Sequence, residues 1–413
     1  MDTQVIISGA GVPGLTLAIL LGQKGIPVHI IDPQEPASLK EVADHETLSG
    51  HTTALMQESL DILEPTGIIE ELEPYAGKLY TMRIIDSSIG HGRFASQKTE
   101  TITQDFDALE IDQNQFGLNI PSNLCRAALA DKALTFPSVT CHFGRKLMDF
   151  TSDSHQVNVR LDDTAEVRGK LLVGTDGRHS VVRAVAQIPT WQHDYGQDAL
   201  TFLIRHSTGH RNISTEFHRP GGPLTFVPLQ DAQGEDTMSS VVWVENTGRA
   251  RDLLALSKQD FRQALQDASQ GILGEIEVIS APASRSLKII AAKRLKGERV
   301  ALAGEAAHAL HPMGAQGLNL SLRDIQTLAA LIQDKAKLGV DIGSRTVLKT
   351  YESRRKLDIN ARLAGTHSLV KSLNHDNRLL HKLRRTGLSA LTSIGPLKTA
   401  VMRAGMTGRL FKS

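Results

Sequence analysis

An acid, two histidines and three glycines occur together in residues 304–324, which read GEAAHALHPMGAQGLNLSLRD. His308 and His311 are three residues apart, so a helix through both would place two metal-binding imidazoles on one face. Pro312, however, disfavours helix at His311. Transition-metal sites usually have three or four ligands, and no cysteine cluster or second histidine pair lies nearby. We therefore expect no metal site, and interpret the segment as a loop that lies against a polar ligand.

The elements around this segment position it at the edge of a sheet. Residues 300–303 (VALA) read as a buried strand, with Glu305 at its carboxyl end. The following SLRDIQTLAALIQ has apolar residues at helical spacing. Because α/β folds bind ligands at the carboxyl ends of their strands, this strand-to-helix junction is a candidate ligand site.

The N-terminal residues carry a dinucleotide-binding pattern in its required setting. Gly9, Gly11 and Gly14 follow a short apolar strand and open an apolar helix, and a second strand ends at Asp32. The first glycine makes the turn, the second lets the backbone approach a pyrophosphate, and the third allows close packing of helix on strand. Free N–H groups at the helix start favour the phosphates, and Asp32 is placed to bind the ribose hydroxyls. The pattern alone fits NAD and FAD equally.

A third segment, GKLLVGTDGRHSVVR at residues 169–183, predicts a buried strand at 171–174 followed by a tight turn. Asp176 and Gly177 suit such a turn by propensity alone. Alternatively, Asp176 and Arg183 bind a ligand at the carboxyl end of that strand.

Composition narrows the class of protein. The chain has 413 residues and a net charge of +1, and its only cysteines, Cys125 and Cys141, cannot build a disulfide framework, so we expect a reducing compartment. No apolar run is long enough to span a membrane, and the first motif starts too early to leave room for a signal or transit peptide.

Residues 371–413 carry nine Lys or Arg and one acid, a charge of +8, against −7 for the remainder. This basic tail either binds an anionic surface or is a solvated helix face.

Short alternating or apolar runs separated by Gly, Pro and Asp follow the third segment, and they predict antiparallel strands. We expect an α/β, Rossmann-like domain at residues 1–78, 105–187 and 284–368, with a substrate domain at 79–104 and 188–283. A basic amphipathic helical segment is expected at 369–413. Four aromatic side chains are candidates for the substrate pocket, although filling the core of the sheet is the commoner role of such residues: they are Phe202, Phe217, Phe226 and Trp243.

The three glycine-containing segments, in this order and at this wide spacing, resemble the single-component flavoprotein aromatic hydroxylases of the p-hydroxybenzoate hydroxylase fold. Within that group, YESRRK at residues 351–356 and LRRTGLSALTSIGPLKTAVMRAGMTG near the C-terminus resemble the ubiquinone-biosynthesis polyprenylphenol hydroxylases. The resemblance runs from Gly9 to Gly408, and the segment at 304–324 is its most specific part.

The resemblance assigns roles to individual residues. The dinucleotide would be FAD, with Asp176 serving both FAD and NAD(P)H, Glu305 near the ribityl or pyrophosphate part, and Pro312 against the reactive edge of the flavin. The backbone at a helix start would donate to the flavin pyrimidine ring and stabilise its reduced anion. The residues implied in FAD binding are Gly9, Gly11, Gly14, Asp32, Asp176, Glu305, Gly317, Leu318 and Asn319.

Three places depart from the pattern of these hydroxylases. Glu305 replaces Asp, Ser49 and His51 stand where Asp and Arg are typical, and Ser122 stands where Arg, Gln or Asn is common. Arg126, one turn further along a predicted helix, is a candidate to compensate. Whether FAD is held tightly is left open by these changes.

The function implied by the resemblance is hydroxylation of an aromatic ring, with polyprenylphenols of ubiquinone biosynthesis as the expected substrates. The reaction would proceed through a flavin C4a-hydroperoxide formed from FAD, NAD(P)H and O₂. We expect a cytoplasmic protein, with peripheral binding to the inner membrane through its basic tail and a homo-oligomer or biosynthetic complex as further possibilities. No aromatic-interleaved basic stripe indicates nucleic acid. Two alternatives stay open: a hydroxylase of another aromatic metabolite, and a non-catalytic scaffold or lipid-binding member of a biosynthetic complex.

Overall fold

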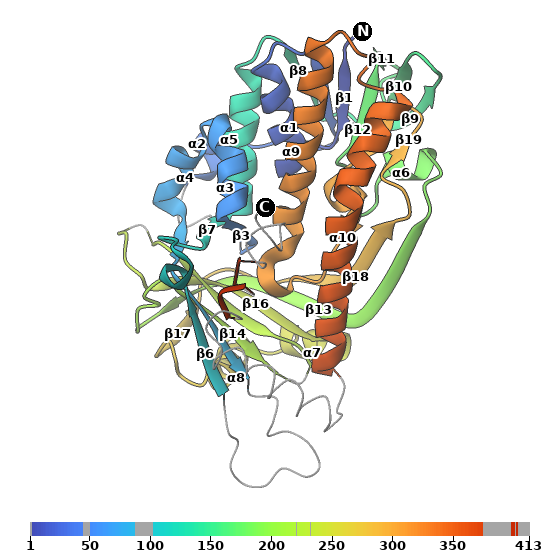
Figure 1. Ribbon diagram of the computed structural model, residues 1–413. Helices are drawn as coiled ribbons and strands as arrows, with labels where there is room; N and C mark the ends of the chain where they lie inside the picture. Colours follow the sequence, from blue (N-terminus) through green and yellow to red (C-terminus); the bar gives the residue numbers. More distant parts are fainter. Residues whose placement is uncertain are drawn as a thin grey trace.

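The computed structural model describes residues 2–43, 50–86, 102–219, 221–231, 233–374, 398–400 and 402–403 (Figure 1). The fold contains two large sheets, and the long helices α9 and α10 run side by side along the first sheet toward the second. The expected mixed α/β fold is confirmed.

The first sheet has the strand order β19-β20-β12-β1-β2-β8, and all of its pairs except β19–β20 are parallel. The buried strands are rich in Val, Ile and Leu, as expected where helices or a second layer cover both faces of a sheet. Its strands are β1 (Val5–Ser8), β2 (Val28–Asp32), β8 (Val139–Phe143), β12 (Leu171–Gly174), β19 (Lys296–Gly297) and β20 (Val300–Leu302). The carboxyl ends of β1, β2, β12 and β20 therefore lie on one edge.

Helix α1 (Val12–Gly22) is apolar on all sides and is buried between the first sheet, α5 (Ser122–Leu134) and α9 (Gln316–Lys337). Helix α10 (Arg345–Asn374) packs on α9. The other helices are α2 (Leu39–Val42), α3 (Gln57–Leu63), α4 (Ile69–Leu72), α6 (Val181–Val185), α7 (Thr247–Leu254) and α8 (Lys258–Ala268). Single 3-10 turns are η1 (Glu64–Thr66), η2 (Glu73–Tyr75), η4 (Ala108–Ile111), η5 (Gly304–Ala306) and η6 (Met313–Ala315).

The second large sheet has the order β21-β18-β13-β16-β15-β14-β5-β6, and β17 also pairs with β13. All of its pairs are antiparallel except β14–β5. Its strands are β5 (Thr81–Asp86), β6 (Ile102–Asp107), β13 (Thr190–His206), β14 (Ile213–His218), β15 (Leu224–Leu229), β16 (Met238–Asn246), β17 (Ile276–Val278), β18 (Ala283–Ala292) and β21 (His308–Ala309).

Two three-stranded sheets complete the fold. One joins β3 (Thr52–Met56), β7 (Gly117–Pro121) and β4 (Gly77–Leu79), and the other joins β9 (Leu147–Ser152), β10 (Val157–Leu161) and β11 (Glu166–Gly169). The first of these lies between the two large sheets, because Asn119 Nδ2 on β7 donates to the Pro228 carbonyl on β15 at 3.0 Å.

The expected helical segment at residues 369–413 lies mostly outside the described residues; α10 contains its beginning and ends at Asn374. Among the helices that the structure describes, none combines the length and the apolar character needed to cross a bilayer.

Candidate functional site

The glycine turn after β1 is packed as tightly as the sequence pattern requires. Gly9 has a φ of +105°, and a Cβ there would lie 2.5 Å from the Thr175 carbonyl oxygen. A Cβ on Gly14 would lie 2.0 Å from the Gly9 carbonyl oxygen. A Cβ on Gly11, in contrast, would make only an ordinary contact with Pro13 Cδ at 3.8 Å, and Gly11 precedes α1 with no side-chain cap on the helix. The turn thus leaves backbone N–H groups and room for a phosphate at the start of α1.

Asp32 ends β2 beside this turn. Its Oδ2 accepts a hydrogen bond from Ala10 N at 2.6 Å, and its Oδ1 lies 3.3 Å from Arg126 Nη2. Arg126 Nε also donates to the Ala10 carbonyl at 2.9 Å. Arg126 therefore links α5 to the glycine turn and to the acid, and is placed where it could also meet an anionic ligand.

His51 and Ser122, the two described positions that depart from the hydroxylase pattern near this edge, contact each other. His51 Nδ1 lies 2.9 Å from Ser122 Oγ, which also lies 3.0 Å from Thr53 Oγ1. Burial, followed by the positive charge of Arg285, lowers the pKa of His51. Ser49 lies outside the described residues.

The turn after β12 is fixed by Asp176 and Arg183. Asp176 Oδ2 accepts from Val182 N at 3.1 Å at the start of α6, and burial raises the pKa of this carboxyl. Arg183 donates to the Arg178 carbonyl at 2.6 Å and to the Ala306 carbonyl at 2.8 Å. Arg183 thus ties the turn to the loop that follows β20.

That loop brings Glu305 to the same edge. Arg178 Nη2 lies 2.9 Å from Glu305 Oε1, and Arg178 Nε donates to the same oxygen at 3.0 Å. Further along, His308 lies in β21 and His311 lies in irregular backbone, so the two histidines do not share a helical face. Pro312 is half-buried and directly precedes η6.

The start of α9 is open to a ligand. Its cap residue, Ala315, provides no side-chain hydrogen bond, its first turn contains no acid, and a Cβ on Gly317 would meet nothing within 4 Å. Asn319 holds this end in place: its Oδ1 accepts from Met56 N at 2.9 Å and its Nδ2 donates to the Ala54 carbonyl at 2.8 Å. The N–H groups of Gly317 and Leu318 are at the positive end of a 22-residue helix, where an anionic ring is stabilised.

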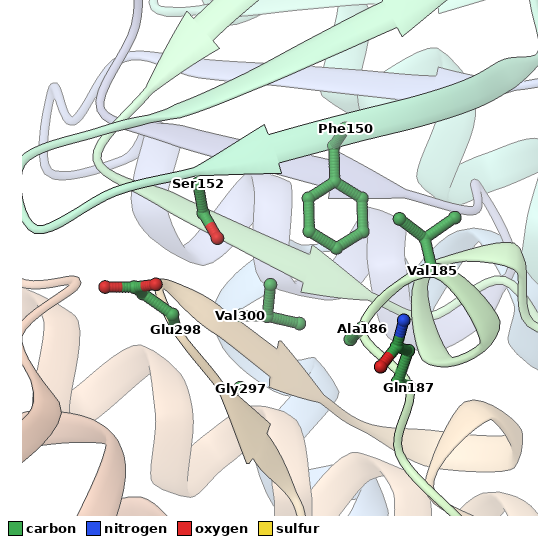
Figure 2. Close-up of a pocket in the computed structure, with 8 residues that line it drawn as sticks. All are labelled: Phe150, Ser152, Val185, Ala186, Gln187, Gly297, Glu298 and Val300. Carbon is green, nitrogen blue, oxygen red and sulfur yellow. The ribbon is translucent and has the colours of Figure 1, made fainter.

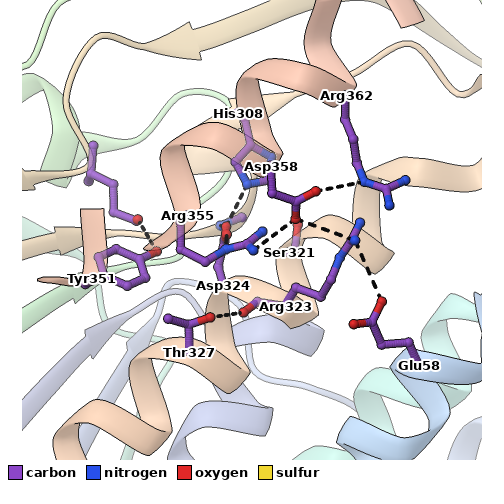
Figure 3. A network of polar contacts seen from close by, with 12 residues as sticks. Glu58, His308, Ser321, Arg323, Asp324, Thr327, Tyr351, Arg355, Asp358 and Arg362 are labelled. Carbon is purple, nitrogen blue, oxygen red and sulfur yellow. Dashed lines mark hydrogen bonds and ion pairs between the residues drawn. The ribbon is translucent and has the colours of Figure 1, made fainter. Parts of the chain in front are cut away.

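A buried charged network supports the loop from beneath (Figure 3). The Asp324 carboxylate accepts hydrogen bonds from Gly304 N at 3.0 Å, His308 Nε2 at 2.6 Å and Arg355 Nε at 2.7 Å. Arg355 also reaches Asp358 at 2.9 Å, and Tyr351 donates to the Leu302 carbonyl at the end of β20. This network fixes α9 and α10 to the strand end from which Glu305 projects.

The four aromatic candidates for the substrate pocket lie in one core cluster beneath α7 and α8. The Phe202 and Trp243 rings pack against Phe261 of α8, with centroids 5.3 and 5.9 Å apart, and the Phe217 and Phe226 rings are 6.2 Å apart. All four side chains are almost completely buried. They therefore fill the core of the sheet, the role that such residues commonly have, on the face turned away from β3 and β7.

One hollow in the described structure has a volume of about 230 Å³ and lies elsewhere (Figure 2). None of the residues singled out from the sequence lines it. Its lining consists of Phe150, Ser152, Val185, Ala186, Gln187, Gly297, Glu298 and Val300.

The residues present fit FAD. A phosphate-sized opening at Gly11, an acid beside it and an uncapped helix start at Gly317 are the features that a dinucleotide ending in an anionic ring requires. Sequence reasoning missed Arg178 and Arg285, two cations near Glu305 and His51. Arg178 stands inside the motif at 169–183 and could have been noticed there, whereas Arg285 lies in a strand with no motif around it.

Comparison with known proteins agrees with these features. A family model described as FAD binding domain matches residues 2–365. The ubiquinone hydroxylase UbiL of Rhodospirillum rubrum is 31% identical over 402 residues, covering 97% of this chain and 89% of that protein. The 3-demethoxyubiquinol 3-hydroxylase of Escherichia coli is 26% identical over 401 residues, covering 97% of each chain.

Solved structures share the fold. The p-nitrophenol 4-monooxygenase PnpA from Pseudomonas putida superposes with a TM-score of 0.78 at 18% identity, covering 99% of both chains. PqsL from Pseudomonas aeruginosa, in complex with 2-aminobenzoylacetate, gives 0.75 at 21% identity, covering 92% of this chain and 99% of that one.

Proposed function

The chain belongs to the FAD-binding-domain family of flavoprotein monooxygenases, and from this premise we propose that it hydroxylates the ring of a polyprenylphenol in ubiquinone biosynthesis. The monooxygenase class rests on relatives named as hydroxylases that match along nearly the whole chain. The substrate class is taken from the names of those relatives, and NAD(P)H and O₂ are the co-substrates that this chemistry requires.

The observation that carries the proposal is the convergence of three segments at one sheet edge. The turn at Gly9, the turn at Asp176 and the loop at Glu305 follow three strands whose carboxyl ends are adjacent in the order β20-β12-β1. Segments nearly 300 residues apart in the chain thus meet where α/β folds bind dinucleotides. A scaffold protein has no need of this arrangement together with an uncapped helix start at Gly317.

The proposed roles follow from the geometry. The turn at Gly9 to Gly14 and the start of α1 hold the pyrophosphate, and Asp32 with Arg126 lies next to the ribose position. FAD, when bound, supplies the electron transfer from NAD(P)H and the transfer of one oxygen atom from O₂ to the ring. The N–H groups of Gly317 and Leu318 would stabilise negative charge on the flavin pyrimidine, and Pro312, directly before η6, would pack against the flavin.

The remaining requirement is the exclusion of water from the reaction. The apolar side chains Met56, Val227 and Ala315 meet in one buried cluster between β3, the large sheet and the start of α9. Such an apolar cluster next to the loop suits an oxygen-transfer reaction that water would otherwise interrupt.

The test is a sequence of three measurements on the full chain. An absorption spectrum after incubation with FAD and removal of free cofactor should show about one flavin per chain. NAD(P)H should then bleach this spectrum faster when a 2-polyprenylphenol is present. Mass spectrometry should finally find a product heavier by one oxygen atom. Retained flavin without a hydroxylated product would reject the substrate class, and no flavin at saturating FAD would favour the scaffold alternative.

A further inference from the structure

One row of side chains in the middle of the large sheet is accessible, and on β13 and β16 its same-face neighbours are buried. It crosses five neighbouring strands, through the register pairs Ile84 with Glu216, Glu216 with Thr225, Thr225 with Val242, and Val242 with Thr201. Every member is partly exposed, whereas the same-face neighbours Ser240 and Leu203 on one side and Val244 and Ala199 on the other are buried. We call these five residues the accessible row.

The accessible row faces the loop that precedes α9. Alternation along β14 and β16 places Phe217 and Trp243 under α7 and α8, and therefore Glu216 and Val242 on the opposite face. On that face, Val227 and Met82 of the sheet meet Ala315 of the loop. The accessible row thus lies on the face of the sheet that meets the loop carrying Pro312 and Ala315, the face on which the proposed function places the substrate.

Glu216 is the one acid of the accessible row, and it is held in a fixed position. Its Oε1 lies 2.8 Å from His218 Nε2, and its side chain is 19% exposed. Burial acts to raise the pKa of Glu216, but the hydrogen bond and charge of His218 lower it below its ordinary value. The carboxylate is therefore ionised at neutral pH. Its Oε2 lies 3.4 Å from Thr225 Oγ1, and Ile84 and Val242 of the same row offer an aromatic ring an apolar surface.

A second polar group, His311, lies on the loop that precedes α9. His311 is 1% exposed, and its Nδ1 accepts a hydrogen bond from Met313 N at 3.4 Å, so Nε2 carries the proton of the neutral ring. Among the described residues, this Nε2 has no hydrogen-bond partner. His311 and Glu216 are near enough for each to influence the pKa of the other. A buried donor without a partner and an ionised acceptor near it are two groups that one phenolic hydroxyl can satisfy, by donating to the acceptor and accepting from the donor.

We propose that Glu216 accepts a hydrogen bond from the phenolic hydroxyl of the substrate, with His311 Nε2 donating to the same oxygen and the ring lying on the accessible row. This inference deepens the proposed function and rests on it. It makes Glu216 the residue that distinguishes a phenol from its ether. Accepting the hydrogen bond also shifts electron density from the hydroxyl into the ring, which favours attack of the ring on an electrophilic oxygen.

The test compares two light-absorbing probes, 4-nitrophenol and its methyl ether 4-nitroanisole. In the ether a methyl group replaces the hydroxyl hydrogen, so the ether cannot donate a hydrogen bond. Their dissociation constants are measured by equilibrium dialysis against the FAD-saturated full chain without NAD(P)H. A hydrogen bond to a charged group should make the phenol bind about 10- to 100-fold tighter than the ether. In Glu216→Gln, which keeps the shape of the side chain, this preference should fall by about tenfold. The matched control is Glu277→Gln, whose side chain is 70% exposed on β17 and whose preference should equal that of the wild type.

A second readout depends on charge alone. An ionised Glu216 beside the hydroxyl should raise the pKa of bound 4-nitrophenol above that of the free probe, and Glu216→Gln should reduce this shift. The other titratable groups around Glu216 are His218 on its own strand, His311 on the loop and Asp86 next to His218 on β5. A titration of the bound 4-nitrophenol between pH 6 and 9 reports the protonation of the probe, because the Glu216 carboxyl stays ionised over this range.

The outcomes separate this inference from the proposed function. A wild type without preference for the phenol overturns the role of Glu216, and so does a folded Glu216→Gln variant with undiminished preference. A structural role alone would lower the stability of that variant and leave both readouts unchanged. If the wild type retains FAD and yields a hydroxylated product but shows no preference, only the inference fails; if no FAD is retained, the proposed function fails first.

Discussion

Replacing Asp324 by alanine should remove most of the buried hydrogen bonds that hold the loop at residues 304–315 in place. The side chain is 0% exposed and accepts three hydrogen bonds, from Gly304 N, His308 Nε2 and Arg355 Nε. Its removal leaves the Arg355 guanidinium, 6% exposed, with Asp358 as its remaining ion-pair partner among the described residues. Breaking a buried ion pair from one side costs about 3–5 kcal/mol. The two other donors add to the cost, but less than additively because all three share one acceptor.

We therefore expect Asp324→Ala to lower the free energy of unfolding by about 4 kcal/mol, a large part of what a folded chain usually has. Urea unfolding monitored by tryptophan fluorescence measures the change. The matched control is Asp334→Ala, an exposed acid on the same helix, which should change stability by less than about 0.5 kcal/mol. FAD affinity should fall with Asp324→Ala as well, because Gly304 and Glu305 lose their anchor.

The pH dependence of this difference has a definite sign. Burial acts to raise the pKa of Asp324, but the charge and hydrogen bonds of His308 and Arg355 lower it below its ordinary value of 3.8. A depressed pKa in the folded state means that the contribution is complete above the unfolded value and is lost as the pH falls through the folded one. The gap between wild type and Asp324→Ala should thus be constant from pH 8 to 5 and shrink below about pH 3.8. An equal stability of the two proteins at pH 7 would refute the assignment of this network as the support of the loop.

Three further results are expected from substitutions and labelling. Gly14→Ala should lose flavin per chain in the absorption spectrum, because its Cβ would lie 2.0 Å from the Gly9 carbonyl oxygen, whereas Gly365→Ala on α10, with nothing within 4 Å, should retain it. Phe202→Ala should lower the free energy of unfolding by about 3–5 kcal/mol. The variant should keep the preference for 4-nitrophenol over 4-nitroanisole, because the Phe202 ring lies under α8. A folded variant that has lost this preference would instead place Phe202 in the pocket. Burial raises the pKa of Cys125 to about 12 and that of Cys141 to about 11, so neither thiol should react with maleimide in the folded protein at pH 7, and rapid labelling of Cys125 would contradict its burial.

Local sequence patterns were sufficient to predict the elements that position the cofactor. The strand expected at 171–174 is β12 over the same residues, and the strand expected at 300–303 is β20, one residue shorter. These segments are short, apolar and followed by glycine turns, so their structure depends on features that lie next to one another in the chain. The steric fit at Gly14 could likewise be expected, because the spacing of the three glycines already defines it.

The contacts between distant segments could not be predicted in this way. His51 meets Ser122 across 71 residues, and Arg183 reaches the Ala306 carbonyl across 123. Neither pair has a spacing that identifies it, since each depends on which strands become neighbours and in which register. The same holds for Asp324, which reads as an ordinary polar residue of a helix until Arg355 and His308 are placed around it.

The accessible row explains why the large aromatic residues of the sheet do not indicate the position of the substrate pocket. In an alternating strand, the large apolar side chains go to the face that helices cover, so the opposite face receives smaller and polar residues. In β14 this places Phe217 under the helices and Glu216 on the open face, and in β16 it does the same for Trp243 and Val242. The residues that contact a ligand on such a sheet are therefore the neighbours of its most conspicuous aromatics. A partly buried acid at one of those neighbouring positions is the stronger indication of a binding site, because it persists in an apolar sheet only with a partner such as His218.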